Sequence, residues 1–83
     1  MKLLYFAWLR AKIGVAEEEL RLPVQVSDVK SLLQWLKQRG PGYAEALKEL
    51  ATIRVAINQD YVGVEHPVRD CDEVAIFPPV TGG

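Results

Sequence analysis

The spacing of hydrophobic positions changes several times along the chain, and each spacing predicts an element. Residues 2–10 are almost continuously apolar and aromatic, which is typical of a central strand that is apolar on both faces. Residues 17–22 alternate between two faces, which predicts a second strand. A turn from Lys12 to Gly14 joins the two runs, so we expect them to form a hairpin.

A helical spacing follows in the middle of the chain. Four apolar residues occupy the i, i+3, i+4 and i+7 positions of an amphipathic helix: Val29, Leu32, Leu33 and Leu36. Ser27 and Asp28 precede this run as candidate N-caps, and Gly40 followed by Pro41 ends it. Residues 43–50 repeat the spacing over a shorter length, so a second, short helix is expected there.

The last third of the chain predicts three more strands. Residues 52–58 alternate cleanly between apolar and polar side chains, which is typical of a half-buried strand. Turn sequences then lead into a short strand over residues 61–64 and a last strand over residues 74–77. Pro78 lacks an N–H group, so the hydrogen-bond ladder should end there.

Together these elements predict an α+β fold. A hairpin, a helix that crosses the sheet and a last strand apolar enough to lie beside the first are the plan of a β-grasp domain. We expect a mixed sheet of about five strands packed on one main helix, and a ferredoxin-like α+β sandwich is the alternative. The domain is expected over residues 1–78, with an extended and flexible tail over residues 79–83.

The phase of the first strand indicates an exposed apolar face. One face would carry Leu3, Tyr5, Ala7 and Leu9, and the other Leu4, Phe6 and Trp8. One helical layer can cover only one face of a sheet. If the second face meets solvent, Phe6 and Phe77 belong to an apolar patch at the root of the tail, and such patches usually mark partner sites. The alternative is that these aromatic side chains are ordinary core.

The composition narrows the class of protein. The chain has 83 residues, of which 49% are hydrophobic and 25% are charged, as in an ordinary globular domain. Its formal net charge of -1 lacks the basic character of a protein that binds nucleic acid or a membrane surface. No apolar run is long enough to span a bilayer, and charged residues break the N-terminal run. The only cysteine, Cys71, excludes an intrachain disulfide and a multi-cysteine metal site, so the cytoplasm is the expected compartment.

The chain ends in FPPVTGG, in which two conformationally restricted prolines are followed, three residues later, by two glycines without side chains. A terminal Gly-Gly arises by chance in roughly 0.5% of chains of average composition. Pro78 and Pro79 favour an extended path, and residues 79–83 could reach roughly 16 to 18 Å. Gly82 and Gly83 lack a Cβ atom, so the terminal backbone can enter a narrow site. We therefore interpret the tail as a reactive segment rather than a frayed end.

Four stretches of the sequence carry a family resemblance. They are LLYFAWLR, AINQDYV, HPVRDCDEVAIFPPV and the terminal TGG. They resemble the small, sulfur-carrying subunits of molybdopterin synthase (MoaD type) in the ubiquitin-like MoaD/ThiS family, and the similarity runs from end to end. The resemblance implies a ubiquitin-like β-grasp fold and a terminal carboxylate that is a reaction site. In this family the terminal glycine is adenylated and then becomes a thiocarboxylate, which places the reaction on Gly83, with Gly82 beside it.

The resemblance also implies partners. An E1-like adenylyltransferase and sulfurtransferase would use ATP and Mg to activate the terminus, and the large subunit of molybdopterin synthase would receive the thiocarboxylate. Two small and two large subunits would form a heterotetramer, in which sulfur passes to cyclic pyranopterin monophosphate during molybdenum cofactor biosynthesis. The chain itself would bind no cofactor or metal and would not be an enzyme on its own. The family's partner-binding surface maps onto Phe6, Tyr61, Phe77, Pro78, Pro79, Val80 and Thr81.

Other interpretations stay open beside this one. A related carrier for thiamine or transfer-RNA thiolation, and a ubiquitin-like modifier joined to lysines, also use a terminal Gly-Gly. His66 and Cys71 could form a base and a nucleophile, but they lie on predicted loops without a third orienting residue. Cys71 stands where the family commonly has Gly, so this turn could be strained. We interpret Glu17–Glu19 as a solvated edge and Trp35 as boundary packing.

Overall fold

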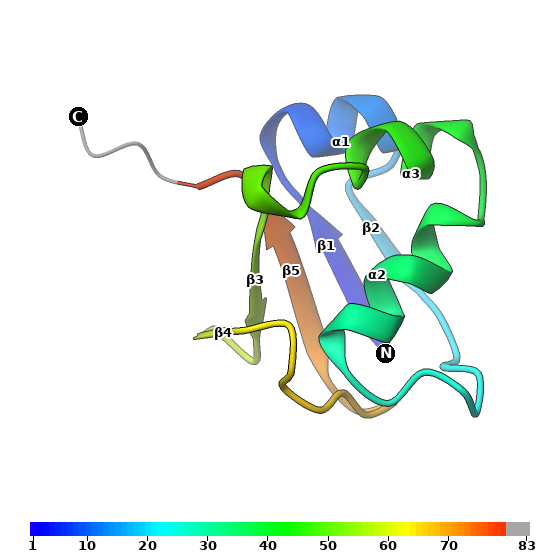
Figure 1. Ribbon diagram of the computed structural model, residues 1–83, viewed down its shortest axis with the longest axis vertical. Coiled ribbons are helices and arrows are strands. Elements are labelled where there is room, and N and C mark those ends of the chain that lie inside the picture. Colours follow the sequence, from blue (N-terminus) through cyan, green and yellow to red (C-terminus); the bar gives the residue numbers. More distant parts are fainter. Residues whose placement is uncertain (80–83) are drawn as a thin grey trace.

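The computed structural model describes residues 1–79 of the 83-residue chain. Figure 1 shows a single sheet with the helices gathered on one side of it. The elements in chain order are β1 (Lys2–Tyr5), α1 (Ala7–Ile13), β2 (Glu17–Glu19), α2 (Val29–Lys37), α3 (Pro41–Ala46), a 3-10 turn η1 (Leu50–Thr52), β3 (Arg54–Ile57), β4 (Asp60–Val62) and β5 (Glu73–Phe77). No helix within residues 1–79 is long and apolar enough to cross a membrane.

The sheet has the order β2-β1-β5-β3-β4. The last strand, β5, lies parallel to the first, β1, and the other three pairings are antiparallel. This confirms the predicted mixed sheet of five strands, with the first and last strands adjacent at its centre. The ferredoxin-like alternative is excluded because parallel pairing of the first and last strands beside a crossing helix is the β-grasp arrangement.

The core lies between the helices and one face of this sheet. Leu3 and Tyr5 of β1 and Ile76 of β5 are at most 1% exposed, and they pack against the apolar stripe of α2. That stripe consists of the four residues that the helical spacing predicts: Val29, Leu32, Leu33 and Leu36. The burial of these side chains is the main favourable contribution to folding in so short a chain.

The prediction of one long first strand is wrong. The strand ends at Tyr5, and residues 7–13 form α1, so a helix rather than a turn separates the two antiparallel strands. Ala7 has φ +56°, a left-handed conformation that turns the chain out of the sheet. Leu9 still reaches the core, but it does so from the helix, and Trp8 is exposed on that helix. Gly14 ends α1 at φ 99°, where its N–H donates to Arg10 O over 2.8 Å.

The predicted start of the main helix is confirmed at Asp28. Its side chain accepts a hydrogen bond from the Ser31 N–H at 2.8 Å, while Ser31 Oγ accepts one from the Asp28 N–H at 3.1 Å. This reciprocal pair is a capping box. The second helix is also present, although it begins earlier and ends sooner than the predicted 43–50. Pro41 is its first residue, and a Cβ at Gly42 would lie 2.4 Å from Lys12 O, so this glycine allows α3 to pack closely on α1.

The predicted strands of the last third are confirmed with small changes in their bounds. Asn58 and Gln59 connect β3 to β4 with φ of 52° and 74°. Two consecutive left-handed residues in a two-residue hairpin connection are typical of a type I′ turn. The last strand ends at Phe77, directly before Pro78, as the missing N–H group predicts.

Candidate functional site

The face of the sheet opposite the helices carries an aromatic patch, which we define as Phe6, Tyr61 and Phe77. The Tyr61 side chain is 75% exposed and Phe6 is 46% exposed, whereas Phe77 is half-buried. The rings of Tyr61 and Phe77 lie 5.3 Å apart between centroids at a tilt of 46°. The structure thus brings Tyr61 of β4 and Phe77 of β5 together on the open face; strand phase predicts this face for Phe77, and the family resemblance implies it for Tyr61.

Phe6 belongs to the same end of the sheet. It is the N-cap of α1 and keeps an extended backbone, with φ -126° and ψ 155°. Its N–H donates to Ile76 O over 3.2 Å, so the ladder between β1 and β5 continues for one residue beyond the strand. This hydrogen bond holds Phe6 at the carboxyl end of β5, where the chain leaves the sheet.

The root of the tail lies beside this patch. Pro78 and Pro79 follow β5 directly, are half-buried, and lead the chain away from the sheet (Figure 1). The other predicted tail residues, Val80, Thr81, Gly82 and Gly83, lie outside the described residues. The part of the site that the structure describes is therefore an exposed aromatic patch with a proline-stiffened segment next to it.

A half-buried polar cluster was not predicted from the sequence. Glu18 is only 16% exposed and receives hydrogen bonds from the Tyr5 hydroxyl at 2.8 Å and the Tyr43 hydroxyl at 2.7 Å. Arg39 Nη1 lies 3.0 Å from Glu18 Oε1 and stacks over the rings of Tyr43 and Trp35. The interpretation of the acidic run as a solvated edge is therefore wrong for Glu18, because Glu18 pairs with Leu3 and shares its covered face.

The hydrogen bonds of the Glu18 cluster shift its ionisation. Burial by itself raises the pKa of Glu18, but the hydrogen bonds from Tyr43, Tyr5 and Arg39 outweigh it and hold the pKa below its usual value. Burial and the hydrogen bond to Glu18 raise the pKa of Tyr5 and of Tyr43. The cluster is therefore stable as one carboxylate, one guanidinium and two neutral hydroxyls, and its role is to tie β1, β2, α2 and α3 together.

The structure does not support a catalytic pair of His66 and Cys71. Both side chains are exposed, and no hydrogen bond joins them in the described part of the chain. His66 Nδ1 lies 2.8 Å from Pro67 O, and since a carbonyl can only accept, this nitrogen carries the proton. The concern about a left-handed Cys71 is also wrong, because this residue has a negative φ. Residues 1–79 contain no group of three or more His, Cys, Asp or Glu placed to hold a metal ion.

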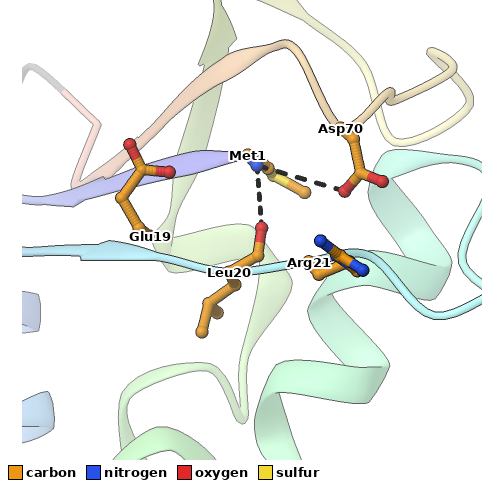
Figure 2. A pocket seen from close by; sticks show the side chains of 5 residues that line it. All are labelled: Met1, Glu19, Leu20, Arg21 and Asp70. Atoms are coloured by element: carbon orange, nitrogen blue, oxygen red, sulfur yellow. Dashed lines mark hydrogen bonds and ion pairs between the residues drawn. The ribbon is translucent and has the colours of Figure 1, made fainter.

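A separate hollow of about 580 Å³ lies around the N-terminus (Figure 2). The Met1 amino group donates to Leu20 O at 2.7 Å and lies 4.0 Å from Asp70 Oδ1. Because β1 and β5 are parallel, Met1 lies at the end of the sheet opposite the root of the tail. We therefore assign this hollow to the anchoring of the first strand and not to the candidate site.

Comparisons with known proteins agree with this fold. The chain matches the model of the ThiS family over residues 3–83. It is 37% identical over 83 residues to the molybdopterin synthase sulfur carrier subunit of Escherichia coli (strain K12), covering 100% of this chain and 99% of that protein. A putative molybdopterin converting factor, subunit 1, from Pyrococcus furiosus has a TM-score of 0.77 and 35% identity, covering 95% of each chain.

The chain is also similar to a solved structure of a protein named as a modifier and not as a sulfur carrier. The small archaeal modifier protein 1 from Methanosarcina acetivorans has a TM-score of 0.70 and 30% identity, covering 99% of this chain and 94% of that one. The chain belongs to the ThiS family, a class of small proteins with the ubiquitin-like fold described above. The resemblance drawn from the four sequence stretches is confirmed.

Proposed function

We propose that this protein is a sulfur carrier in molybdenum cofactor biosynthesis. The observation that carries the proposal is the match with the molybdopterin synthase sulfur carrier subunit of Escherichia coli, which covers this chain from end to end. The exposed aromatic patch beside the root of a Gly-Gly tail supports it, because such a carrier must present its terminus to another protein. We place this chemistry in the cytoplasm, where ATP is available.

The reactive group in this proposal is the carboxylate of Gly83. A carboxylate is a poor electrophile, because its charge repels nucleophiles and oxide is not a usable leaving group. Transfer of AMP from ATP forms a mixed anhydride and releases pyrophosphate. A hydrosulfide-level sulfur then attacks the carbonyl carbon and AMP leaves, which yields the thiocarboxylate directly. Where the donor is a persulfide, the attack gives an acyl disulfide, and a thiol cleaves its S–S bond to release the thiocarboxylate while the thiol and the donor sulfur become a disulfide. The thiocarboxylate sulfur forms a bond to cyclic pyranopterin monophosphate, and water then hydrolyses the resulting thioester, so that the sulfur stays on the pterin and the carboxylate of Gly83 returns.

Two partners follow from this chemistry. An E1-like activating enzyme would supply ATP and Mg, and the large subunit of molybdopterin synthase would hold the pterin, in a heterotetramer of two small and two large subunits. The protein itself is the non-catalytic, sulfur-donating subunit. We expect the aromatic patch and residues 78–81 to contact both partners, while Gly82 keeps the chain thin enough for Gly83 to reach the reaction site.

A ubiquitin-like modifier is the second candidate, and the likeness to the small archaeal modifier protein favours it. A modifier would form an amide bond between Gly83 and a lysine side chain of another protein. Both functions begin with adenylation, so the fate of the activated terminus distinguishes them.

Intact-mass analysis tests both candidates. After incubation with a cognate activating enzyme, Mg-ATP and a sulfur donor, the mass should rise by the difference between one sulfur and one oxygen, and fragmentation should place the change on Gly83. Deletion of Gly83 is the matched control, because it moves the carboxylate back by one residue and leaves residues 1–79 unchanged. Equal thiolation of the deletion variant would refute the carrier function, and conjugates to lysine instead of the thiocarboxylate would favour the modifier.

A further inference from the structure

One arginine at the root of the tail is not explained by the fold. Arg54 is the first residue of β3 and pairs with Phe77 across the ladder to β5. Its neighbours Ile53 and Val55 are buried on the helix-covered side. Because side chains alternate along a strand, the exposed Arg54 lies on the open face, next to a member of the aromatic patch. It also lies close to the point where the chain leaves the sheet.

Two main-chain carbonyls hold the Arg54 guanidinium in place. Nη1 donates to Ile53 O at 2.9 Å and to Ala51 O, in η1, at 3.3 Å. Nε and Nη2 make no hydrogen bond to any of residues 1–79, and Arg54 makes no ion pair within that part of the chain. Within residues 1–79, main-chain carbonyls thus orient the Arg54 guanidinium, while its Nε and Nη2 edge has no partner.

The charges around Arg54 are unevenly distributed. Residues 7–13 and 45–54, which meet at the tail end of the sheet, contain four basic and two acidic residues, a net charge of +2. Residues 58–73 contain five acidic and one basic residue, a net charge of -4 with His66 neutral. Figure 1 shows α1, α3 and η1 at the end from which the tail departs, and most of residues 58–73 at the other end. The docking end therefore complements an acidic partner surface.

We propose that Arg54 binds a carboxylate of the molybdopterin synthase large subunit, an Asp or Glu side chain at the rim of the cleft that receives the tail. This proposal rests on the proposed function, since it concerns the same docking surface. Nε and one Nη2 N–H form the fork that matches the two oxygens of a carboxylate. Because the main-chain carbonyls already orient the guanidinium, little side-chain freedom remains to be lost on binding. A lysine would carry the charge but could not reproduce this geometry.

Two other roles for Arg54 make different predictions. If Arg54 only satisfies the carbonyls of Ala51 and Ile53, its removal lowers stability and leaves partner affinity unchanged. If it pairs with the protein's own terminal carboxylate and holds the tail back, its removal strengthens partner binding. Only a contact with a partner carboxylate predicts that removal of the Arg54 side chain weakens partner binding, and that the difference in Kd between variant and wild type depends on the salt concentration.

The test is calorimetric titration of the full-length protein with the molybdopterin synthase large subunit encoded by the same genome. Arg54→Met should raise Kd about ten-fold or more at low salt, and this difference should shrink at high salt. Arg54→Lys should fall between Arg54→Met and the wild type. Arg69→Met is the matched control, because Arg69 is also an exposed arginine but lies in the acidic segment, and its Kd should equal that of the wild type.

The outcomes separate this inference from the proposed function. Equal Kd values for the wild type and Arg54→Met, or tighter binding by the variant, would overturn the role of Arg54 while thiolation of Gly83 still supports the carrier. A wild type that is neither thiolated nor bound would refute the carrier itself. Urea unfolding of each variant shows whether it is folded. If Arg54→Met is unfolded, the comparison of Arg54→Lys with the wild type tests the proposal. A Kd raised several-fold for Arg54→Lys supports the need for the guanidinium fork, and an unchanged Kd overturns it.

Discussion

Replacing Glu18 with alanine should destabilise the fold far more than an equal change one residue away. Glu18 lies on the covered face of the sheet and accepts hydrogen bonds from Tyr5, Tyr43 and Arg39. Glu19 is exposed, belongs to the same short strand, and makes no ion pair among residues 1–79. The pair Glu18→Ala and Glu19→Ala therefore isolates the effect of the polar cluster from that of alanine in β2.

The expected magnitude follows from the exposure of each donor. Tyr5 is 1% exposed, so its hydroxyl would lose its acceptor without gaining water, at a cost of about 1 to 3 kcal/mol. Arg39 is 29% exposed and can regain water, so its ion pair adds at most about 1 kcal/mol. We therefore expect the free energy of unfolding to fall by about 2 to 3 kcal/mol for Glu18→Ala, and to change by less than about 0.5 kcal/mol for Glu19→Ala.

Urea unfolding of a double-mutant cycle measures this contribution. Tyr5→Phe alone removes the donor and leaves Glu18 with its other two partners, so it should cost about 1 kcal/mol. In the double variant the buried Tyr5 hydroxyl is absent, and the half-buried Tyr43 hydroxyl can turn to water, so the total loss should be smaller than the sum of the two single losses by about 1 kcal/mol or more. Strict additivity would show that the Tyr5–Glu18 hydrogen bond does not contribute, and a loss for Glu19→Ala equal to that for Glu18→Ala would refute the argument altogether.

Three further predictions concern pH, the β3–β4 turn and the patch. Because the pKa of Glu18 is lowered, its contribution to the free energy of unfolding is complete above the ordinary value of 4.5 and is lost as the pH falls through the folded-state pKa. Urea unfolding of Glu18→Ala should therefore lose less stability than the wild type when the pH is lowered. Parallel curves of stability against pH for the two proteins would contradict this. Gln59→Gly should raise stability by about 1 kcal/mol in thermal unfolding because φ is 74°, whereas unchanged or lower stability would argue against a type I′ turn. Phe77→Asp should remain folded by circular dichroism but bind both partners about 30-fold more weakly, and an unfolded variant would assign Phe77 to the core.

Periodicity predicted the main helix because α2 is buried on one side only, and the structure confirms its stripe. In β3 the alternation correctly predicted that Val55 and Ile57 face the core, but Ala56 on the other face is buried as well. The hydrophobic pattern of residues 2–10 does not distinguish a strand from a helix, since a continuous apolar run fits a buried strand and a buried helix equally well. The change from strand to helix depends on the left-handed Ala7, and alanine gives no sign in the sequence that it adopts this conformation.

The polar cluster was missed for a different reason. Glu18 was grouped with its acidic neighbours, although it shares the alternation of Leu20 and Leu22 and so belongs to the inward face. That phase was the available signal. The partners that make its burial favourable lie 13, 21 and 25 residues away, on β1, at the end of α2 and on α3. Only the packing of the helices on the sheet brings them together, and no local pattern contains that information.

The two faces of the central strands differ: one carries the core, and the other carries the proposed docking residues. Tyr5 and Phe6 are consecutive, yet Tyr5 is buried under the helices and Phe6 is exposed next to the end of β5. In the same way, Ile76 belongs to the core and Phe77 to the aromatic patch. In the proposed function this separation is an advantage, because the open face would contact two different partners without any change in the core that holds it. Variants of the covered face should accordingly lower the free energy of unfolding without altering the partner affinity of the molecules that remain folded. Variants of the open face should weaken partner binding and leave the free energy of unfolding unchanged. An open-face change that unfolds the protein would show that stability and partner binding do not depend on separate faces.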